Sequence, residues 1–287
     1  MSQIIDGKAI AANLRLNIKD QIKEQTDKDQ RPPGLDVILV GEDPASKIYV
    51  RNKKLACEQV GIISQIHHLP EDTHEEDLLN LIQDLNQDSS VDGILCQLPL
   101  PSHISEAKVI ETISPEKDVD GFHPINSGRV FAGSDGFSPC TPAGIIQMLK
   151  SIKFDFIGKN AVVIGRSNIV GKPMAILLLN ENCTVTIAHS KTKNLAAICQ
   201  KADLLVTSAG QRDFVTKDFT NENQVIIDVS INRNDEGQVV GDVKFEEVAP
   251  HVKAITPVPG GVGPMTIAML LKNTLDSYLQ KQANHQV

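Results

Sequence analysis

One helical stretch early in the chain carries polar side chains at spacings that place them on a single face. Ser46, Tyr49 and Lys53 stand at positions i, i+3 and i+7 of this stretch. A tyrosine offers a flat ring and a hydroxyl to an aromatic ligand, and a lysine shielded from water can exchange protons near neutral pH. The alternative is an ordinary solvated helix face, since the neighbouring Arg51 is a typical surface residue.

Two more polar residues stand where an open α/β sheet would hold a ligand. Gln97 directly follows an apolar run typical of a strand, and ligands of such sheets bind beyond the carboxyl ends of the strands. Asp118 and Asp120 lie in a long loop, where a carboxylate could accept two N–H bonds from an aminopyrimidine-type ring. These residues and the helix face predict one polar substrate site.

A glycine-containing turn predicts an anion site in the second half of the chain. Gly165, Arg166 and Ser167 follow a buried-type strand and Gly171 opens a helix, so free backbone N–H groups would point at a ligand above the turn. The spacing departs from the common G-x-G-x-x-G pattern, and a tight turn without a ligand is the alternative reading.

The segment after the next strand indicates which dinucleotide would bind there. An NAD enzyme usually carries an acidic residue for the ribose hydroxyls about 20 residues after the turn. This chain has Ser190 and Lys191 instead. A hydroxyl and a cation, together with Arg166, could hold a 2′-phosphate, which favours NADP as the cofactor. Lys191 could equally face solvent at a helix start.

The elements that must position these residues alternate between apolar strands and amphipathic helices. This alternation predicts the α/β class, with parallel sheets covered by helices on both faces. Thr73 and Glu76 predict a capping box for one of the helices. The expected helices span residues 7–25, 44–61, 142–150, 171–180 and 264–279, and the expected strands span residues 35–40, 62–69, 91–96, 161–164, 183–188, 203–207 and 224–229.

A long segment rich in Pro, Gly, Asp and Ser, from Ser114 to Thr141, predicts a domain junction near its end. We expect two α/β domains with a cleft between them. The first comprises residues 1–140, with a C-terminal helix of residues 264–287 packing back on it. The second, residues 141–263, is expected to be a Rossmann-like, doubly wound parallel sheet.

The bulk properties of the 287 residues exclude several classes of partner. A net charge of −8 argues against a general nucleic-acid binder, which would normally carry a basic surface. No apolar run approaches the length of a membrane span, and the N-terminus lacks the pattern of a secretory signal. The five cysteines include no C-x-x-C pair, which favours a reducing, cytoplasmic location.

The histidines His67, His68 and His74, with acidic residues nearby, invite a metal-site interpretation that we reject. His67 and His68 are adjacent in an expected strand and therefore point to opposite faces, while His74 starts a helix. We expect no metal.

Six segments, in order along almost the whole chain, closely resemble the bifunctional methylenetetrahydrofolate dehydrogenase/cyclohydrolase family. Several of them are long and specific, and the one small departure noted is Ala143, where a longer residue is expected. The segments are Tyr49–Lys53, Cys96–Pro101, Pro115–Gly121, Gly165–Pro173, His189–Thr192 and Thr256–Thr266.

The resemblance implies a substrate, two reactions and a role for each polar residue. Lys53 would be the catalytic lysine, Gln97 would hydrogen-bond and tune it, Asp120 would grip the pterin nitrogens, and Tyr49 would stack on the folate beside Ser46. The implied enzyme oxidises 5,10-methylenetetrahydrofolate with NADP to the methenyl cation, then hydrolyses that cation to 10-formyltetrahydrofolate.

The resemblance also extends to the cofactor and the assembly. Gly165, Arg166, Ser167 and Ser190 would bind NADP, with Ile231 and Thr266 near the nicotinamide. Pro259 and Gly260 would contact the substrate, although a plain interdomain hinge explains that glycine- and proline-rich segment nearly as well. The family further implies a homodimer.

Two other functions are compatible with parts of the pattern. A dehydrogenase without the hydrolytic step would need no Gln97 beside Lys53. A non-catalytic NADP-binding scaffold would need the Gly165 turn but not the polar set in the first domain. The presence of that complete set counts against both.

Overall fold

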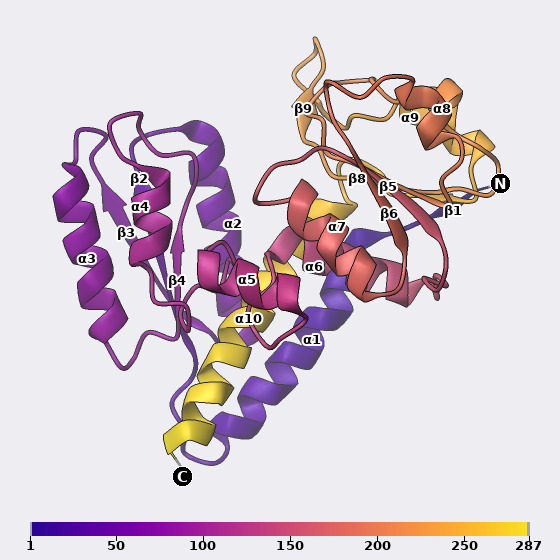
Figure 1. Ribbon diagram of the computed structural model, residues 1–287. Coiled ribbons are helices and arrows are strands. Elements are labelled where there is room, and N and C mark those ends of the chain that lie inside the picture. Colours follow the sequence, from indigo (N-terminus) through magenta and orange to yellow (C-terminus); the bar gives the residue numbers. More distant parts are fainter. Residues whose placement is uncertain (1, 286–287) are drawn as a thin grey trace. The chain divides into compact units, whose positions relative to one another are not determined.

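The computed structural model describes residues 2–285, which form two compact units with separate parallel sheets (Figure 1). The first unit contains Met1–Ala12 and Thr141–Thr266. The second contains Asn13–Cys140 and Ile267–Val287. Among the described residues, no helix is both long and apolar enough to cross a membrane.

The first unit is built on a six-stranded parallel sheet in the order β1-β11-β8-β7-β5-β6. The chain runs from β5 outward to the edge strand β6, then returns to the other side of β5 for β7. This reversal between β5 and β7 is a switch point, where open α/β sheets bind ligands beyond the strand ends. The strands are β1 (Gln3–Ile4), β5 (Asn160–Ile164), β6 (Thr184–Ala188), β7 (Leu204–Thr207), β8 (Val225–Asp228) and β11 (Ala254–Ile255).

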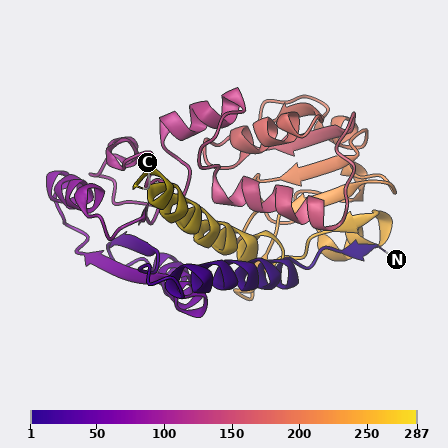
Figure 2. The ribbon, with the colours of Figure 1, turned by 90° about the horizontal axis from the view of Figure 1, so that it is seen from below.

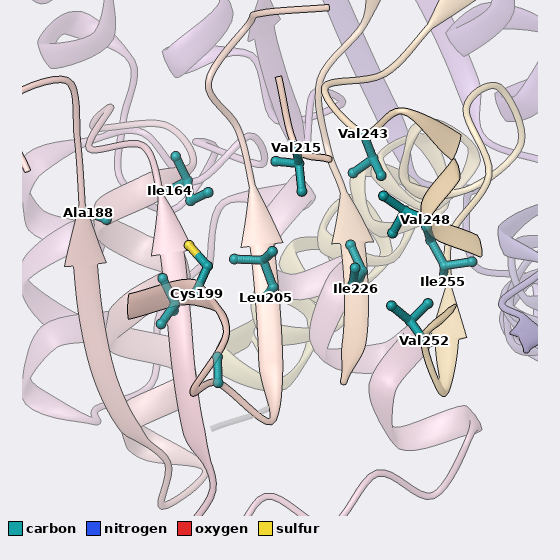
Figure 3. Close-up of a cluster of buried hydrophobic side chains, with 12 residues drawn as sticks. Ile164, Ala188, Cys199, Leu205, Val215, Ile226, Val243, Val248, Val252 and Ile255 are labelled. Carbon is teal, nitrogen blue, oxygen red and sulfur yellow. The ribbon is translucent and has the colours of Figure 1, made fainter. Parts of the chain in front are cut away.

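Helices cover both faces of this sheet, as its buried, almost wholly apolar central strands require. Helix α7 (Gly171–Asn180) contacts β5 and β6 on one face. On the other face, Figure 3 shows Leu205 and Ile226 projecting from β7 and β8 into a core that α8 (Leu195–Cys199) and α9 (Phe245–Val248) help to close. The predicted doubly wound α/β fold is confirmed. The remaining elements of this unit are α6 (Cys140–Ser151), η1 (Lys217–Phe219), η2 (Ala249–His251) and the β9 (Asn232–Arg233) and β10 (Val239–Val240) hairpin.

The second unit has a parallel sheet in the order β3-β2-β4, and an isolated parallel bridge between Ile94 and Asp118 extends it beyond β4. Helix α2 contacts β2 and β3, while α3 and α4 contribute to the core on the face that contains Ile38. The elements are β2 (Gly34–Val40), α2 (Pro44–Val60), β3 (Ile63–Leu69), α3 (Glu75–Gln87), β4 (Gly93–Cys96), α4 (Glu106–Thr112) and α5 (Pro124–Ala132).

Two long helices, α1 (Gly7–Thr26) and α10 (Val262–His285), complete the chain. Their parts within the second unit run beside each other in both views (Figures 1 and 2). Ser277 of α10 donates its hydroxyl to the carbonyl oxygen of Asp92 at 2.7 Å, and Asn273 donates to that of Val119 at 2.9 Å. These bonds hold α10 in the second unit, although more than a hundred residues of the first unit separate it from the rest of the second unit in the sequence.

The first twelve residues depart from the predicted division of the chain. The sequence predicts that they belong with residues 13–140, whereas the structure groups them with Thr141–Thr266. The reason is that β1 adds to the edge of the six-stranded sheet, with hydrogen bonds of 2.9 Å from Gln3 N to Lys253 O and from Ile5 N to Ile255 O. A strand of two residues leaves no periodic pattern in the sequence.

One local prediction is wrong. Helix α3 has His74 at its N-cap without a side-chain capping bond, and Thr73 donates its hydroxyl to Pro70 O at 2.7 Å instead of capping the helix. The segment before the predicted junction also contains a helix that was not predicted, α5. Its N-cap His123 accepts a bond from Ile125 N at 3.0 Å, and Gly133 ends the helix at φ +68°.

Candidate active site

Helix α2 and strand β4 bring Lys53 and Gln97 into contact. Lys53 is half-buried and its Nζ donates to Gln97 Oε1 at 3.0 Å. Gln97 follows β4 at the carboxyl end of the sheet, and its Nε2 donates to Leu98 O at 2.7 Å, which turns the amide oxygen toward the lysine. The contact predicted to form part of a polar site is therefore present.

The start of α2 determines where this lysine stands. Asp43 caps the helix, and its carboxylate accepts the backbone N–H of Ser46 at 2.7 Å, which lowers the pKa of Asp43. Ser46 is buried, while Tyr49 is 38% exposed. All three polar residues predicted for one face occupy the same helix.

The two aspartates that flank Val119 have different surroundings in the structure. Asp118 is buried and accepts bonds from Phe122 N at 3.1 Å, His123 N at 2.8 Å and Asn126 Nδ2 at 2.9 Å. Burial raises the pKa of Asp118 to about 6, against the lowering effect of these bonds. The carboxyl oxygens of Asp118 thus bond to the segment that follows it, and these bonds fix the loop that carries Asp120.

Asp120 is the aspartate that shares an environment with Lys53. Burial raises the pKa of Asp120, while the positive charge of Lys53 and a hydrogen bond from the Cys140 thiol act in the opposite direction. The buried Cys140 thiol also lies 3.3 Å from the carbonyl oxygen of Val119. The amine, the amide and this carboxyl group thus form one polar cluster in the second unit.

The glycine turn of the first unit leaves no room for side chains. Gly165 has φ +123°, and a Cβ there would lie 2.3 Å from Ser208 Oγ and 2.8 Å from Ser208 O. A Cβ on Gly171 would lie 2.3 Å from Gly165 O. The backbone therefore closes tightly at the switch point between β5 and β7, which suits a ligand that approaches main-chain N–H groups.

The residues around this turn are exposed and carry hydroxyl or cationic groups. Ser167 Oγ accepts bonds from Val170 N at 3.1 Å and Gly171 N at 3.3 Å, and Arg166 is exposed. After β6, His189 N donates to Thr192 Oγ1 at 2.9 Å and closes a turn in which Ser190 is exposed. The segment Ala188–Thr192 contains no acidic residue.

The remaining predicted site residues also belong to the first unit. Gly260 has φ +107° and its carbonyl oxygen accepts the backbone N–H of Lys8 at 3.1 Å, while the Val258–Pro259 peptide is cis. The hydroxyls of Thr266 and Thr141 are 2.9 Å apart. Ile231 is 52% exposed.

The histidines considered for a metal site have other partners. His67 Nε2 lies 2.7 Å from Asp36 Oδ2, and His68 Nε2 lies 2.9 Å from Gly41 O. Residues 2–285 contain no group of three or more His, Cys, Asp or Glu side chains that could hold a metal ion.

Two family models divide the chain between them. One, described as the tetrahydrofolate dehydrogenase/cyclohydrolase catalytic domain, matches residues 5–120. The other, described as the NAD(P)-binding domain of tetrahydrofolate dehydrogenase/cyclohydrolase, matches residues 139–282. This chain belongs to the tetrahydrofolate dehydrogenase/cyclohydrolase family.

Individual relatives of the family match over nearly the full length. The bifunctional protein FolD of Campylobacter curvus is 56% identical over 282 residues, which cover 98% of each chain. The crystal structure of the bifunctional FolD of Campylobacter jejuni has a TM-score of 0.96 at 48% identity and covers 98% of this chain and 100% of that one. The FolD of Trypanosoma brucei, whose structure holds NADP and an inhibitor, has a TM-score of 0.93 at 34% identity and covers 98% of both chains.

The sequence analysis did not identify two residues that support this candidate site, Asp43 and Cys140. Asp43 as the cap of α2 was readable, because an aspartate before proline at a helix start is a standard capping signal. The family resemblance selected Asp120, but the bonds by which Asp118 holds the loop were not readable from the sequence. Cys140 carries no local signal, since its contact with Asp120 spans the loop and α5.

Proposed function

We propose that the protein is a bifunctional folate enzyme. It oxidises 5,10-methylenetetrahydrofolate to 5,10-methenyltetrahydrofolate with NADP and hydrolyses that product to 10-formyltetrahydrofolate. The observation that carries this proposal is the 3.0 Å bond between Lys53 Nζ and Gln97 Oε1, beside Asp120. Relatives named as bifunctional dehydrogenase/cyclohydrolases, one of them solved with NADP, support it.

The residues of the second unit bind the substrate. Asp120 accepts N–H bonds from the aminopyrimidine end of the pterin, which favours its carboxylate form despite burial. Tyr49 stacks its partly exposed ring on the folate, and the buried Ser46 lines the same helix face. Together they place the one-carbon bridge near Lys53.

The first unit binds the cofactor at the Gly165 turn. The lack of space for a Cβ at Gly165 and Gly171 fits a pyrophosphate that rests on main-chain N–H groups. Arg166 and Ser190, in a segment without acidic residues, suit the 2′-phosphate of NADP. When bound, NADP accepts a hydride from the one-carbon bridge of the substrate.

Hydrolysis then depends on proton movements at Lys53. The amine of Lys53 takes a proton from the incoming water as the water oxygen bonds to the positive methenyl carbon. The same group returns a proton to the ring nitrogen that departs. Gln97 accepts a bond from Lys53 Nζ and so keeps the amine directed at the reacting carbon.

The test is the NADP-dependent oxidation of methylenetetrahydrofolate, followed through the methenyl to the formyl product. Methenyl hydrolysis measured without NADP separates the two steps. An intact protein without hydrolysis would be a dehydrogenase only, and one without either activity would be a scaffold. Oxidation with NAD as efficient as with NADP would contradict the role given to Arg166 and Ser190.

The variant Lys53→Met tests the proton-transfer role. We expect hydrolysis to fall by about 100-fold or more, the usual contribution of a positioned general base, with unchanged NADP affinity. Lys54→Met, which removes the exposed neighbouring lysine, is the matched control and should hydrolyse normally. Normal hydrolysis by Lys53→Met would mean that another group carries the proton.

A cytoplasmic location and a homodimer remain predictions from the sequence and the family resemblance.

A further inference from the structure

Asp242 is a fully buried carboxylate that accepts five hydrogen bonds. Its Oδ2 accepts from Thr207 Oγ1 at 2.9 Å, Ala209 N at 2.7 Å and Ser230 Oγ at 2.8 Å. Its Oδ1 accepts from Gln211 N at 2.8 Å and Asn232 Nδ2 at 3.1 Å. All five donors are uncharged hydroxyl, amide or backbone N–H groups, and they satisfy a buried carboxyl group that would be costly to leave without hydrogen bonds.

The five donors come from the end of β7 and the loop after it, and from the segment between β8 and the start of β9. Thr207 ends β7, and Ala209 and Gln211 lie in the loop that follows it. Ser230 and Asn232 follow β8. Gly210 N also donates to Ser230 Oγ at 3.1 Å, which ties the two loops directly to each other.

These loops adjoin the parts of the first unit that we assign to NADP. Ser208, in the loop after β7, is the residue against which Gly165 closes. Ile231, after β8, lies between two residues that both donate to Asp242, and its own side chain is 52% exposed. Asp242 therefore fixes both flanks of Ile231 and leaves its apolar side chain facing outward.

A second buried aspartate holds the backbone of Asp242 in place. Asp228 Oδ1 accepts from Asp242 N at 3.1 Å and its Oδ2 accepts from Val243 N at 2.8 Å. A Cβ on Gly241 would lie 1.9 Å from Asp228 Oδ2, so the chain passes this carboxyl as closely as glycine permits. Asp228 thus fixes the backbone at Asp242, and the side chain of Asp242 binds the segments that follow β7 and β8.

We propose that Asp242 is a positioning residue for the cofactor, which holds the loops after β7 and β8 in the shape that receives the dinucleotide beside Ile231. The inference rests on the proposed use of NADP. An amide at position 242 has one acceptor oxygen and would present its NH₂ group to N–H or O–H donors. The loops would then shift without any change at the residues that touch the folate.

The test compares Asp242→Asn with the wild type in NADP affinity, measured by calorimetry, and in KM for NADP during oxidation. We expect both to weaken by about tenfold or more, because small displacements of contact groups cost that much. Methenyl hydrolysis without NADP should stay within about twofold, since the residues assigned to it, among them Lys53, Gln97 and Asp120, belong to the other unit. The matched control is Asp235→Asn, which alters a highly exposed carboxylate between β9 and β10 and should change neither reading.

The single-donor variants Ser230→Ala and Asn232→Ala keep the test decisive if Asp242→Asn fails to fold. Each removes one bond to Asp242 and should raise KM for NADP by a few-fold, again with hydrolysis preserved. Unchanged NADP affinity in folded variants, or hydrolysis falling in parallel with it, would overturn the positioning role. A wild type that oxidises the substrate with NAD and neither binds nor uses NADP would instead overturn the proposed function, so the two failures are distinguishable.

Discussion

At the scale of single residues, buried carboxyl groups organise the loops that carry the candidate site. Asp118 shapes the loop of Asp120 through three accepted bonds, and Asp242 joins two loops through five. Burial raises the pKa of Asp118 to about 6 and that of Asp228 to about 7. Each of these groups supports a neighbouring segment at a cost in desolvation.

Asp228 makes a pH-dependent contribution to stability whose sign follows from its raised pKa. The native state binds the proton of Asp228 more tightly than the unfolded chain, whose pKa is near 3.8. The free energy of unfolding therefore falls as pH rises from about 4 to about 7, by at most about 1.4 kcal/mol per pH unit. Asp228→Asn removes this dependence, although its NH₂ group also replaces one of the two acceptor oxygens.

Urea unfolding at pH 5 and pH 8 measures the effect. From pH 5 to pH 8 the wild type should lose about 2–3 kcal/mol of its free energy of unfolding relative to Asp228→Asn. Asp218→Asn, a change at an exposed aspartate of the same unit, should follow the wild type at both values. Parallel curves for Asp228→Asn and the wild type would contradict the raised pKa.

At the scale of elements, the turn from β5 into α7 depends on two glycines for different reasons. Gly165 needs both a positive φ and contact with Ser208, while Gly171 needs only the close approach to Gly165 O. The turn lies at the point where the strand order reverses, so its shape decides what can rest above the sheet.

Gly165→Ala should lower NADP affinity by about tenfold or more and destabilise the protein by about 1–3 kcal/mol. The added Cβ meets the backbone oxygen of Ser208, so the turn must move. Gly158→Ala is the matched control, because Gly158 also has positive φ, +70°, but faces open space. It should cost about 1 kcal/mol of strain without an effect on NADP, and equal NADP affinities for the two variants would refute the close-packed turn.

At the scale of the whole molecule, each unit is assembled from segments distant in the sequence. The first twelve residues add a strand to the sheet of residues 141–266, and α10 returns to the second unit. Buried Asp92 helps to hold α10 in the second unit, because its carbonyl oxygen accepts the Ser277 hydroxyl. Its carboxylate accepts two bonds from Arg31, of 2.6 and 2.7 Å. Arg31 in turn lies over the ring of Tyr278 at 5.2 Å.

Asp92→Ala should therefore reduce the free energy of unfolding by about 2–3 kcal/mol, because it removes charge-assisted bonds from Arg31 and a bond from the backbone N–H of Gly34. Asp84→Ala, at an exposed position of α3, should change it by no more than about 0.5 kcal/mol. Urea unfolding of the two variants gives the comparison. A loss for Asp92→Ala as small as for the control would show that the Arg31 cluster contributes little.

The sequence by itself determined the features that depend on local pattern. Apolar runs between amphipathic helices indicated parallel sheets with two covered faces, and an acid-free segment after β6 favoured NADP. The helix spacing of Ser46, Tyr49 and Lys53 placed them on one element. Periodicity, turn chemistry and side-chain type act within a few residues, so they can be read from the chain directly.

Only the tertiary structure decided which distant groups meet. It showed the bond between Lys53 and Gln97 that the family resemblance had implied, the contacts by which Asp118 holds its loop, and the five donors around Asp242. It also moved the first twelve residues to the sheet of the other unit. Such contacts depend on strand order and register, which bring residues tens of positions apart within hydrogen-bonding distance and leave no trace in local periodicity.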